Sequence, residues 1–193
     1  MIESVCVYCA SSRQAEPRYR ASAQELGALL ARDGLTVVYG GGGGGSMGAL
    51  ADGALGAGGR VVGVLPRFME DLEWGHPGVE RRVVADMHER KRTMLELSQA
   101  TVALPGGCGT FEEVLEAMAW KRLGLWSGPI VILNERGFYD PLLAMLERAV
   151  AERFMDERHR ALWSVAAHPG AVPAALLDAP GWDAGAARSF AVP

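Results

Sequence analysis

Short runs of apolar and β-branched residues alternate along this chain with longer stretches of helical periodicity. The short runs predict six strands and a briefer seventh, at residues 5–9, 35–39, 60–65, 83–85, 101–104, 130–133 and 163–166. The longer stretches predict six helices, at residues 17–32, 46–55, 87–99, 110–123, 139–154 and 172–177. This alternation is typical of α/β proteins, so we expect a parallel sheet of six or seven strands flanked by helices on both faces.

Length and composition fit a single domain. The chain has 193 residues, of which 49% are hydrophobic and 22% are charged, which is enough for one globular core. We expect one domain over residues 1–178 and a flexible tail over residues 179–193, a stretch rich in Ala, Gly and Pro.

Charge and hydropathy exclude several classes of partner. The net charge is −4, whereas a protein that coats nucleic acid or an anionic membrane needs a basic face. The longest apolar runs fall far short of the roughly 20 residues that span a bilayer, and the amino terminus lacks the pattern of a signal peptide. We therefore expect a cytoplasmic protein that binds neither nucleic acid nor membranes.

The C-x-x-C pair formed by Cys6 and Cys9 lies in a strand-like stretch. Redox pairs of this kind open a helix, and structural zinc needs a second pair of ligands, which the scattered histidines do not supply. We interpret both cysteines as ordinary buried thiols and expect no metal site.

Glycine makes up 25 of the 193 residues, and much of it lies in two strand-to-helix turns. The first turn runs from Gly40 through Gly45 into Ser46. Glycine lets backbone N–H groups approach an anion at the positive end of a helix, which favours a phosphate site. A Walker loop is excluded because no lysine precedes Ser46, and NAD binding is disfavoured because no acid follows the strand at residues 60–65.

The second turn is more specific, because a hydroxyl and a carboxylate accompany its glycines. It consists of Gly106, Gly107, Cys108, Gly109 and Thr110, with Glu113 inside the following helix. Two interpretations are open: a tight packing turn with Thr110 as the helix cap, or a phosphate cradle with an acid or base beside it. No histidine lies near Cys108 in the sequence to act as its base, so we interpret Cys108 as a spacer.

Charged residues fall on the apolar faces of two predicted helices. Arg90 and Lys91 lie within the apolar stripe of the helix at residues 87–99, and Glu113 shares a side with Ala117 and Trp120. Long side chains can reach solvent from such positions; otherwise a buried cation needs an anion. The economical hypothesis is that Arg90, Lys91, Glu113 and the second turn converge on one phosphorylated ligand.

Four segments together resemble the Lonely Guy (LOG) family of cytokinin riboside 5′-monophosphate phosphoribohydrolases. The segment from Pro105 to Glu113 resembles the family's P-G-G-x-G-T-x-x-E motif, and Met87-His88-Glu89-Arg90-Lys91 resembles M-H-x-R-K. The first glycine turn resembles Y-G-G-G-x-x-G-x-M-G, and Cys9-Ala10-Ser11-Ser12 resembles C-G-S-S. The resemblance covers residues 5–154.

The resemblance implies a Rossmann-like fold and hydrolysis of the N-glycosidic bond of N6-prenylated AMP, and of AMP itself, to free base and ribose 5-phosphate. It implies that Arg90 and Glu113 are the catalytic pair, that no cofactor or metal is needed, and that the protein is a homodimer with the site near the subunit interface. Glu113 would stabilise positive charge on the ribose or activate water, while Arg90 orients Glu113 and keeps it ionised. The substrate-binding residues that it implies are Ser12, Gly41, Gly42, Gly45, Met47, Glu73, Lys91, Gly106, Gly107, Cys108, Gly109 and Thr110.

Departures from the family pattern bear on substrate preference. Ala10 replaces a common glycine, Gly43 a common serine, and Ala119 a threonine often found near the purine. Two other functions compete with hydrolysis. Relatives have been labelled lysine decarboxylases, but pyridoxal phosphate needs a Schiff-base lysine, and the chain has only Lys91 and Lys121. A nucleotide-sensing module would bind without turnover, for which an enclosed Arg90–Glu113 pair is unnecessary.

Overall fold

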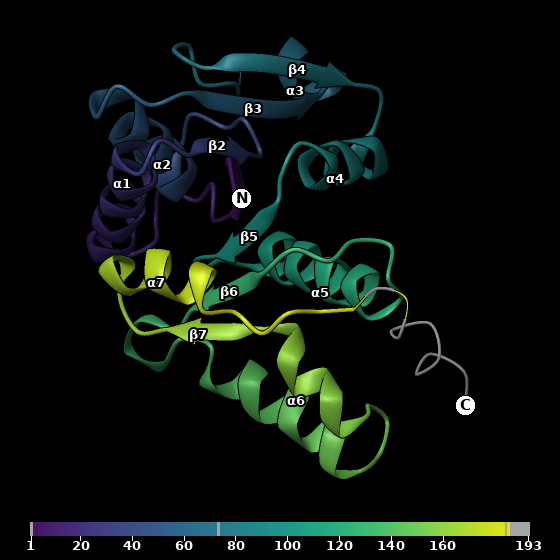
Figure 1. Ribbon diagram of the computed structural model, residues 1–193. Helices are drawn as coiled ribbons and strands as arrows, with labels where there is room; N and C mark the ends of the chain where they lie inside the picture. Colours follow the sequence, from purple (N-terminus) through teal and green to yellow (C-terminus); the bar gives the residue numbers. More distant parts are fainter. Residues whose placement is uncertain (1, 73, 184, 186–193) are drawn as a thin grey trace.

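A computed structural model describes residues 2–72, 74–183 and 185 of the chain. Its described part contains a seven-stranded sheet in the order β4-β3-β2-β1-β5-β6-β7, with every neighbouring pair parallel (Figure 1). The strands are β1 (Ser4–Tyr8), β2 (Thr36–Tyr39), β3 (Val61–Pro66), β4 (Glu80–Val84), β5 (Ala100–Ala103), β6 (Ile130–Leu133) and β7 (Ser164–Ala166).

Helices cover both faces of this sheet. They are α1 (Pro17–Arg32), α2 (Gly45–Gly56), α3 (Arg67–Asp71), α4 (Met87–Glu96), α5 (Cys108–Arg122), α6 (Asp140–Ala151) and α7 (Val172–Leu177), with short 3-10 turns at Glu135–Gly137, Glu157–Leu162 and Pro169–Ala171. In Figure 1, α1, α2 and α7 lie on one side of the sheet and α4 and α5 on the other. The expected α/β fold, with a parallel sheet between two helical layers, is confirmed.

The alternation of side chains along β1 explains why both faces need a cover. Val5 and Val7 belong to the core under α1, α2 and α7, whereas Cys6 and Tyr8 belong to the core under α4, α5 and α6. Because successive residues of a strand point to opposite faces, a strand that is apolar throughout is stable only between two layers. All five residues of β1 are buried.

The sequence prediction differs from the structure at the edge of the sheet and at helix ends. Strand β4 begins at Glu80 rather than at residue 83. Its first three residues are charged, as is common on edge strands, so the apolar pattern in the sequence did not include them. The short α3 was not predicted. Helix α4 ends at Glu96, three residues before the predicted end, and α6 ends at Ala151, before a residue in the left-handed region, Arg153 (φ 65°).

The carboxyl-terminal stretch contacts the body of the protein where it is described. Trp182, within the predicted tail over 179–193, is half-buried and packs against the core on the α4, α5 and α6 side. Residues 184 and 186–193 of that predicted tail lie outside the described residues. None of the described helices is long and apolar enough to cross a membrane.

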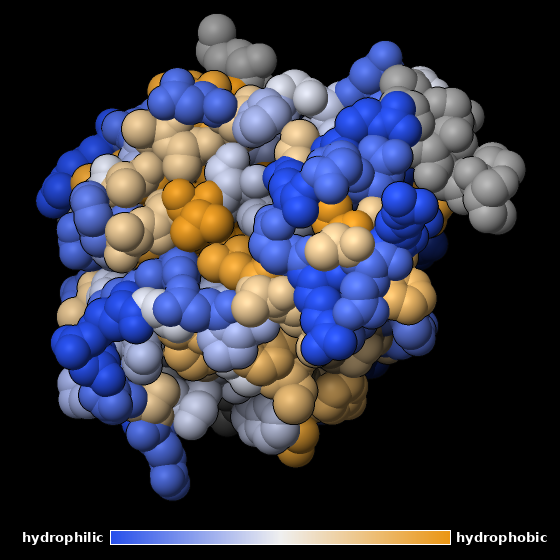
Figure 2. Space-filling view, turned by 90° about the horizontal axis from the view of Figure 1, so that it is seen from below, coloured by the Kyte–Doolittle hydropathy of each residue, from blue (hydrophilic) through white to orange (hydrophobic). Residues whose placement is uncertain are grey.

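The surface beneath β7 and α6 is mixed in character. Seen from below, hydrophobic side chains gather near the middle of this face and are flanked by hydrophilic ones (Figure 2). On α6 itself Met145 is exposed, whereas Leu146 and Val150 are buried. Helix α6 therefore turns one apolar edge to the core and leaves part of another in solvent.

The order of the sheet reverses at β1, which lies between β2 and β5. The turns that follow these strands lead toward α1, α2 and α5. In open α/β sheets ligands bind in the crevice at such a reversal, outside the carboxyl ends of the strands. The fold thus brings both glycine turns to one edge of the sheet.

Candidate active site

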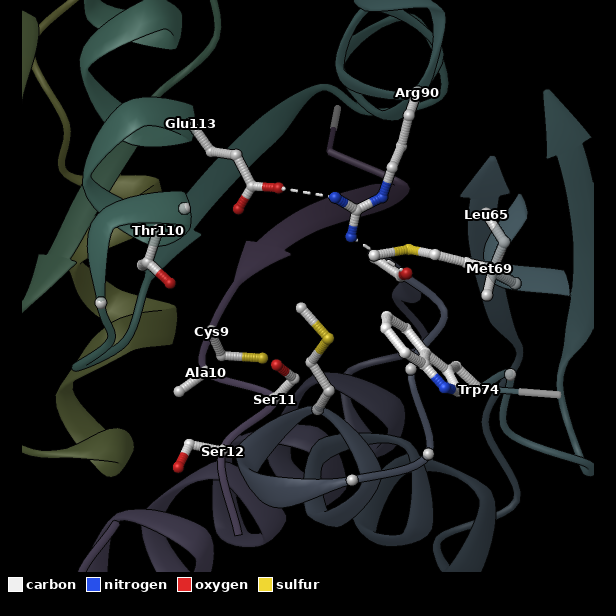
Figure 3. Close-up of a pocket in the computed structure, with 18 of the residues that line it drawn as sticks. Cys9, Ala10, Ser11, Ser12, Leu65, Met69, Trp74, Arg90, Thr110 and Glu113 are labelled. Carbon is white, nitrogen blue, oxygen red and sulfur yellow. Dashed lines mark hydrogen bonds and ion pairs between the residues drawn. The ribbon is translucent and has the colours of Figure 1, made fainter. Parts of the chain in front are cut away.

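A cavity of about 860 Å³ opens at this reversal of strand order. Its walls come from the turns after β1, β2 and β5, from the start of α4, and from the segment between β3 and β4 (Figure 3). A cavity of this volume is within the usual range for small-molecule sites, about 300–1,000 Å³. The polar side chains of Ser12, Thr110 and Glu113 lie on one side of it and the apolar ones of Leu65, Met69 and Trp74 on the other.

In the first glycine turn, close packing requires several of the glycines. Gly41 and Gly45 have φ angles of 79° and 59°, in the left-handed region, which side chains disfavour. A Cβ at Gly45 would also lie 2.5 Å from the carbonyl oxygen of Ser12. These two glycines shape the turn and do not line the cavity themselves, whereas Gly42 and Met47 do.

In the second turn, the glycines at the cavity leave open space. A Cβ built on Gly107 or Gly109 would meet no atom of the described chain within 4 Å, and both residues line the cavity. Packing therefore does not require glycine at either position. Exposed backbone at the start of α5 is what close approach of an anion needs.

Thr110 does not cap α5, so the part of the packing-turn interpretation that made it the helix cap is wrong. The N-cap is Gly107, and among the described residues no side chain caps this helix end. Thr110 lies inside the first turn with its side chain buried, and it lines the cavity (Figure 3). A Cβ on Gly106 would lie 2.2 Å from the Thr110 hydroxyl, so glycine at residue 106 makes room for that hydroxyl.

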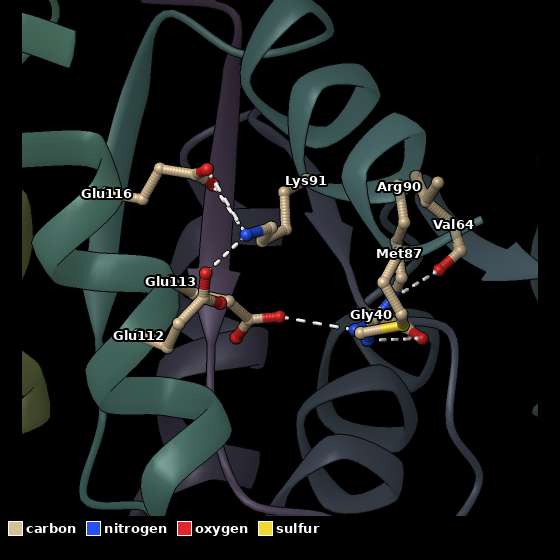
Figure 4. Close-up of polar contacts among 8 residues, drawn as sticks. All are labelled: Gly40, Val64, Met87, Arg90, Lys91, Glu112, Glu113 and Glu116. Carbon is tan, nitrogen blue, oxygen red and sulfur yellow. Dashed lines mark hydrogen bonds and ion pairs between the residues drawn. The ribbon is translucent and has the colours of Figure 1, made fainter.

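Arg90 is fixed by backbone carbonyls and aimed at Glu113 (Figure 4). Its Nε donates to the Val64 carbonyl at 3.1 Å, and its Nη2 donates to the Gly40 carbonyl at 3.0 Å. The third contact is an ion pair between Nη1 and Oε1 of Glu113, 3.3 Å apart. The side chains of Arg90 and Glu113 are 5% and 6% exposed. The predicted burial of these two charges, and their convergence, are confirmed.

Glycine at residue 40 is a condition for this arrangement. A Cβ there would lie 1.9 Å from Nη2 of Arg90, so any side chain displaces the guanidinium. Helix α4 supports Arg90 from the other end, because the Asp86 carboxylate caps the helix by accepting from the N–H groups of His88 and Glu89, each at 2.8 Å.

Burial sets the protonation of Glu113. Loss of solvation raises the pKa of Glu113 from an ordinary 4.5 to about 7, and the nearby Arg90 lowers it only in part. Glu112 and Glu116 act in the same direction as burial. Arg90 therefore acts in the expected direction, toward the carboxylate of Glu113, while burial acts against it.

Lys91 points away from the cavity, into an ion cluster between α4 and α5. Its Nζ pairs with Glu112 and lies 3.2 Å from the Glu116 carboxylate (Figure 4). Burial lowers the pKa of Lys91, but these two hydrogen bonds outweigh burial and raise it. Lys91 is not among the lining residues, so the described structure does not bring it together with Arg90 and Glu113 on one ligand.

The structure brings most of the other predicted site residues to the cavity or next to it. Those that line it are Ser12, Gly42, Met47, Gly107, Gly109 and Thr110. Gly106 lies directly behind Thr110, and Cys108 opens α5 with an exposed thiol. Glu73 lies outside the described residues.

The cysteines in β1 and just after it are buried and free, as predicted. Burial raises the pKa of both the Cys6 and the Cys9 thiols, which makes them poor nucleophiles. No cluster of three or more His, Cys, Asp or Glu side chains in the described part of the chain could hold a metal ion.

Pyridoxal phosphate does not fit the two lysines of this chain. Lys91 is held by two carboxylates, and Lys121 is 1% exposed and donates to the Leu162 carbonyl at 3.0 Å. Burial lowers the pKa of Lys121 to about 8, but neither lysine belongs to the described lining of the cavity. A Schiff base would have no amine within reach.

Sequence reasoning missed the wall opposite Thr110, formed by Leu65, Met69 and Trp74. Met69 comes from the unpredicted α3, and Trp74 comes from the segment that follows it. Single apolar residues in such a segment have no periodicity that separates a ligand wall from core. The exposure of Trp74 becomes visible only in the structure.

Comparison with known proteins identifies relatives over most of the chain. A family model described as "possible lysine decarboxylase" matches residues 47–176. A rice (Oryza sativa subsp. japonica) protein named a probable cytokinin riboside 5′-monophosphate phosphoribohydrolase is 46% identical over 160 residues, 82% of this chain and 70% of its own. The rice cytokinin riboside 5′-monophosphate phosphoribohydrolase LOG is 43% identical over 81% of this chain and 65% of its own, so the chain spans just under two thirds of that relative. A protein of that name from Rhodococcoides fascians is 45% identical over 79% of this chain and 78% of its own.

Solved structures share the fold at lower sequence identity. The molybdenum cofactor binding protein from Rippkaea orientalis has a TM-score of 0.69 and 23% identity, covering 90% of this chain and 94% of its own. The molybdenum cofactor carrier protein from Chlamydomonas reinhardtii has a TM-score of 0.67 and 24% identity, covering 92% and 97%. At these identities the likeness concerns the fold alone.

Proposed function

This chain belongs to the Lonely Guy family of cytokinin riboside 5′-monophosphate phosphoribohydrolases, and on that premise we propose that it hydrolyses the N-glycosidic bond of N6-prenylated AMP. Water and the nucleotide give the free base and ribose 5-phosphate. We extend the proposal to AMP itself, because the reacting bond and the ribose phosphate are the same in both.

The buried Arg90–Glu113 pair is the observation that carries this proposal. Both side chains line the cavity, although burying two charges is costly and a binding site alone does not need them. Glycosidic cleavage develops positive charge on the ribose, which a carboxylate stabilises. A pKa of about 7 for Glu113 also suits proton transfer to or from water at neutral pH.

The start of α5 supplies the complementary site for the phosphate. Backbone N–H groups at Gly107 and Gly109 and the Thr110 hydroxyl lie at the positive end of a helix, a favourable position for an anion. Ser12 adds a second hydroxyl from the turn after β1. In this proposal the role of Lys91 is indirect. It pairs with Glu112 and Glu116 and so helps to hold α5, which carries the phosphate site, in position.

We also propose that the active form is a homodimer in the cytoplasm, with the site near the subunit interface. Helix α5 buries Glu113 on its inner side and leaves Leu115 41% exposed. Leu123 and Leu125, at and just beyond its end, are 42% and 62% exposed. Apolar side chains gathered along one element are suited to a partner subunit. Light scattering of the purified protein at micromolar concentration is expected to give twice the mass of 20.6 kDa.

The test of the reaction is product analysis on matched variants. Purified protein is incubated with N6-prenylated AMP, AMP and the corresponding nucleosides, and the products are resolved by chromatography. Glu113→Gln and Arg90→Ala are expected to abolish base release, while Glu96→Gln and Arg92→Ala, an exposed pair on α4, retain it. The nucleosides are expected to react poorly because they lack the phosphate. Tight nucleotide binding without base release by the wild type would instead show a sensing module.

A further inference from the structure

One wall of the active-site cavity is apolar and has no assigned role. Leu65 is the last but one residue of β3, Met69 lies on α3, and Trp74 follows α3. Figure 3 shows these three side chains together, across the cavity from Thr110 and Glu113. Arg90 lies at the edge between the two sides.

The segment that carries Trp74 is fastened to the first glycine turn. The N–H of Gly43 donates to the Trp74 carbonyl, and the N–H of His76 donates to the Gly41 carbonyl, each at 2.9 Å. These bonds form an antiparallel bridge between Gly42 and Gly75, beside an otherwise parallel sheet. The backbone on both sides of Trp74 is therefore held in place at the cavity.

A second contact ties the same segment to α2. Nε2 of His76 lies 3.1 Å from the Asp52 carboxylate, and Nδ1 accepts from the N–H of Gly78 at 3.1 Å. His76 is 9% exposed, so this anchor is largely enclosed. The Trp74 indole takes no part in this anchor and lines the cavity, together with Gly75 and Pro77.

Trp74 itself is 55% exposed although the backbone around it is anchored. Exposed aromatic surface at a cavity is suited to a flat ligand group, because an aromatic face binds any nucleobase by stacking. The other cavity wall offers hydroxyls, backbone N–H groups and the charged pair, which suit ribose and phosphate. The two sides thus divide a nucleotide into its polar and aromatic parts.

We propose that Trp74 is a substrate-binding residue that contacts the face of the purine ring, with Leu65 and Met69 completing the wall. This inference rests on the proposed function, since it assigns one part of the same substrate. With the base against Trp74 and the phosphate at Thr110, the glycosidic bond lies between them, on the side of Arg90 and Glu113. Ring contact, not contact with the N6 substituent, is the interaction assigned to Trp74.

The test compares Trp74→Ala and Trp74→Phe with Phe68→Ala, a control in α3 that is 49% exposed and outside the cavity lining. KM and kcat are measured with N6-prenylated AMP, and competitive inhibition constants are measured for adenine and for ribose 5-phosphate. Trp74→Ala is expected to raise KM and the adenine inhibition constant by about tenfold. Trp74→Phe, which keeps an aromatic face, is expected to have a KM and an adenine inhibition constant close to those of the wild type.

The ribose 5-phosphate inhibition constant distinguishes the loss of a base contact from a general disturbance of the cavity. It is expected to stay within twofold in Trp74→Ala, because this ligand has no base, and Phe68→Ala is expected to match the wild type throughout. An adenine constant that does not change in Trp74→Ala, or a parallel rise for ribose 5-phosphate, would overturn the assignment. Inactivity of the wild type itself would contradict the proposed function instead, and adenine binding by calorimetry would then still test Trp74.

Discussion

Replacing Glu113 by glutamine is expected to stabilise the protein, and to do so only above acidic pH. Glutamine has the shape of the protonated acid and cannot ionise. Because burial raises the pKa of Glu113 from 4.5 to about 7, the folded wild type binds more protons than the unfolded chain between these values, and its stability falls as pH rises. At about 1.4 kcal/mol per pKa unit, the free energy of unfolding of the wild type falls by about 3 kcal/mol between pH 4.5 and pH 8. That of the variant has no such contribution.

Urea denaturation followed by tryptophan fluorescence measures this difference. The free energies of unfolding of Glu113→Gln and wild type are expected to agree near pH 4.5, to diverge up to pH 7, and to differ by about 3 kcal/mol at pH 8. The control Glu96→Gln, on an exposed residue, is expected to differ from wild type in its free energy of unfolding by less than about 0.5 kcal/mol at pH 4.5 and at pH 8. A Glu113→Gln variant less stable than wild type at pH 8 would refute the reasoning, since the ion pair with Arg90 would then outweigh burial.

Three further predictions concern activity. Gly40→Ala is expected to lose most activity while keeping the circular dichroism spectrum of the wild type, because the added Cβ displaces the Arg90 guanidinium. The control Gly56→Ala, whose Cβ meets no described atom within 4 Å, is expected to match the wild type. Equal activity of the two variants would contradict this prediction. Thr110→Val is expected to weaken competitive inhibition by ribose 5-phosphate about tenfold, through loss of a hydrogen bond to the phosphate, and an unchanged constant would remove Thr110 from the phosphate site. The pH profile of kcat/KM is expected to bend near pH 7, where Glu113 titrates, and a flat profile from pH 5 to 9 would exclude that titration.

Much of the fold and the centre of the site could be predicted from the sequence. Short apolar runs and helical periods predicted strands and helices that the structure contains within a few residues of their expected ends. Arg90 and Glu113 stood out because charged residues on an apolar helix face need partners. Each of these signals lies within one short segment, so a single chain is enough to recognise it.

Other parts depend on contacts between distant segments. Lys91 shows the same local signal as Arg90, and the acidic partners of both cations lie on α5. Sequence periodicity therefore could not show that only Arg90 lines the cavity. Trp74 is placed by backbone pairing between Gly42 and Gly75, which has no side-chain signature. The pKa of Glu113 reflects a balance of burial against one cation, which only the packed structure supplies.

In the proposed reaction, Glu113 is the group on which hydrolysis depends most. The most direct measurement is the chromatographic yield of base and of ribose 5-phosphate from N6-prenylated AMP at pH 7, with the wild type and Glu113→Gln side by side. We expect equal amounts of the two products from the wild type and none above background from a folded Glu113→Gln variant. Base release by Glu113→Gln at a rate close to that of the wild type would contradict the role of Glu113.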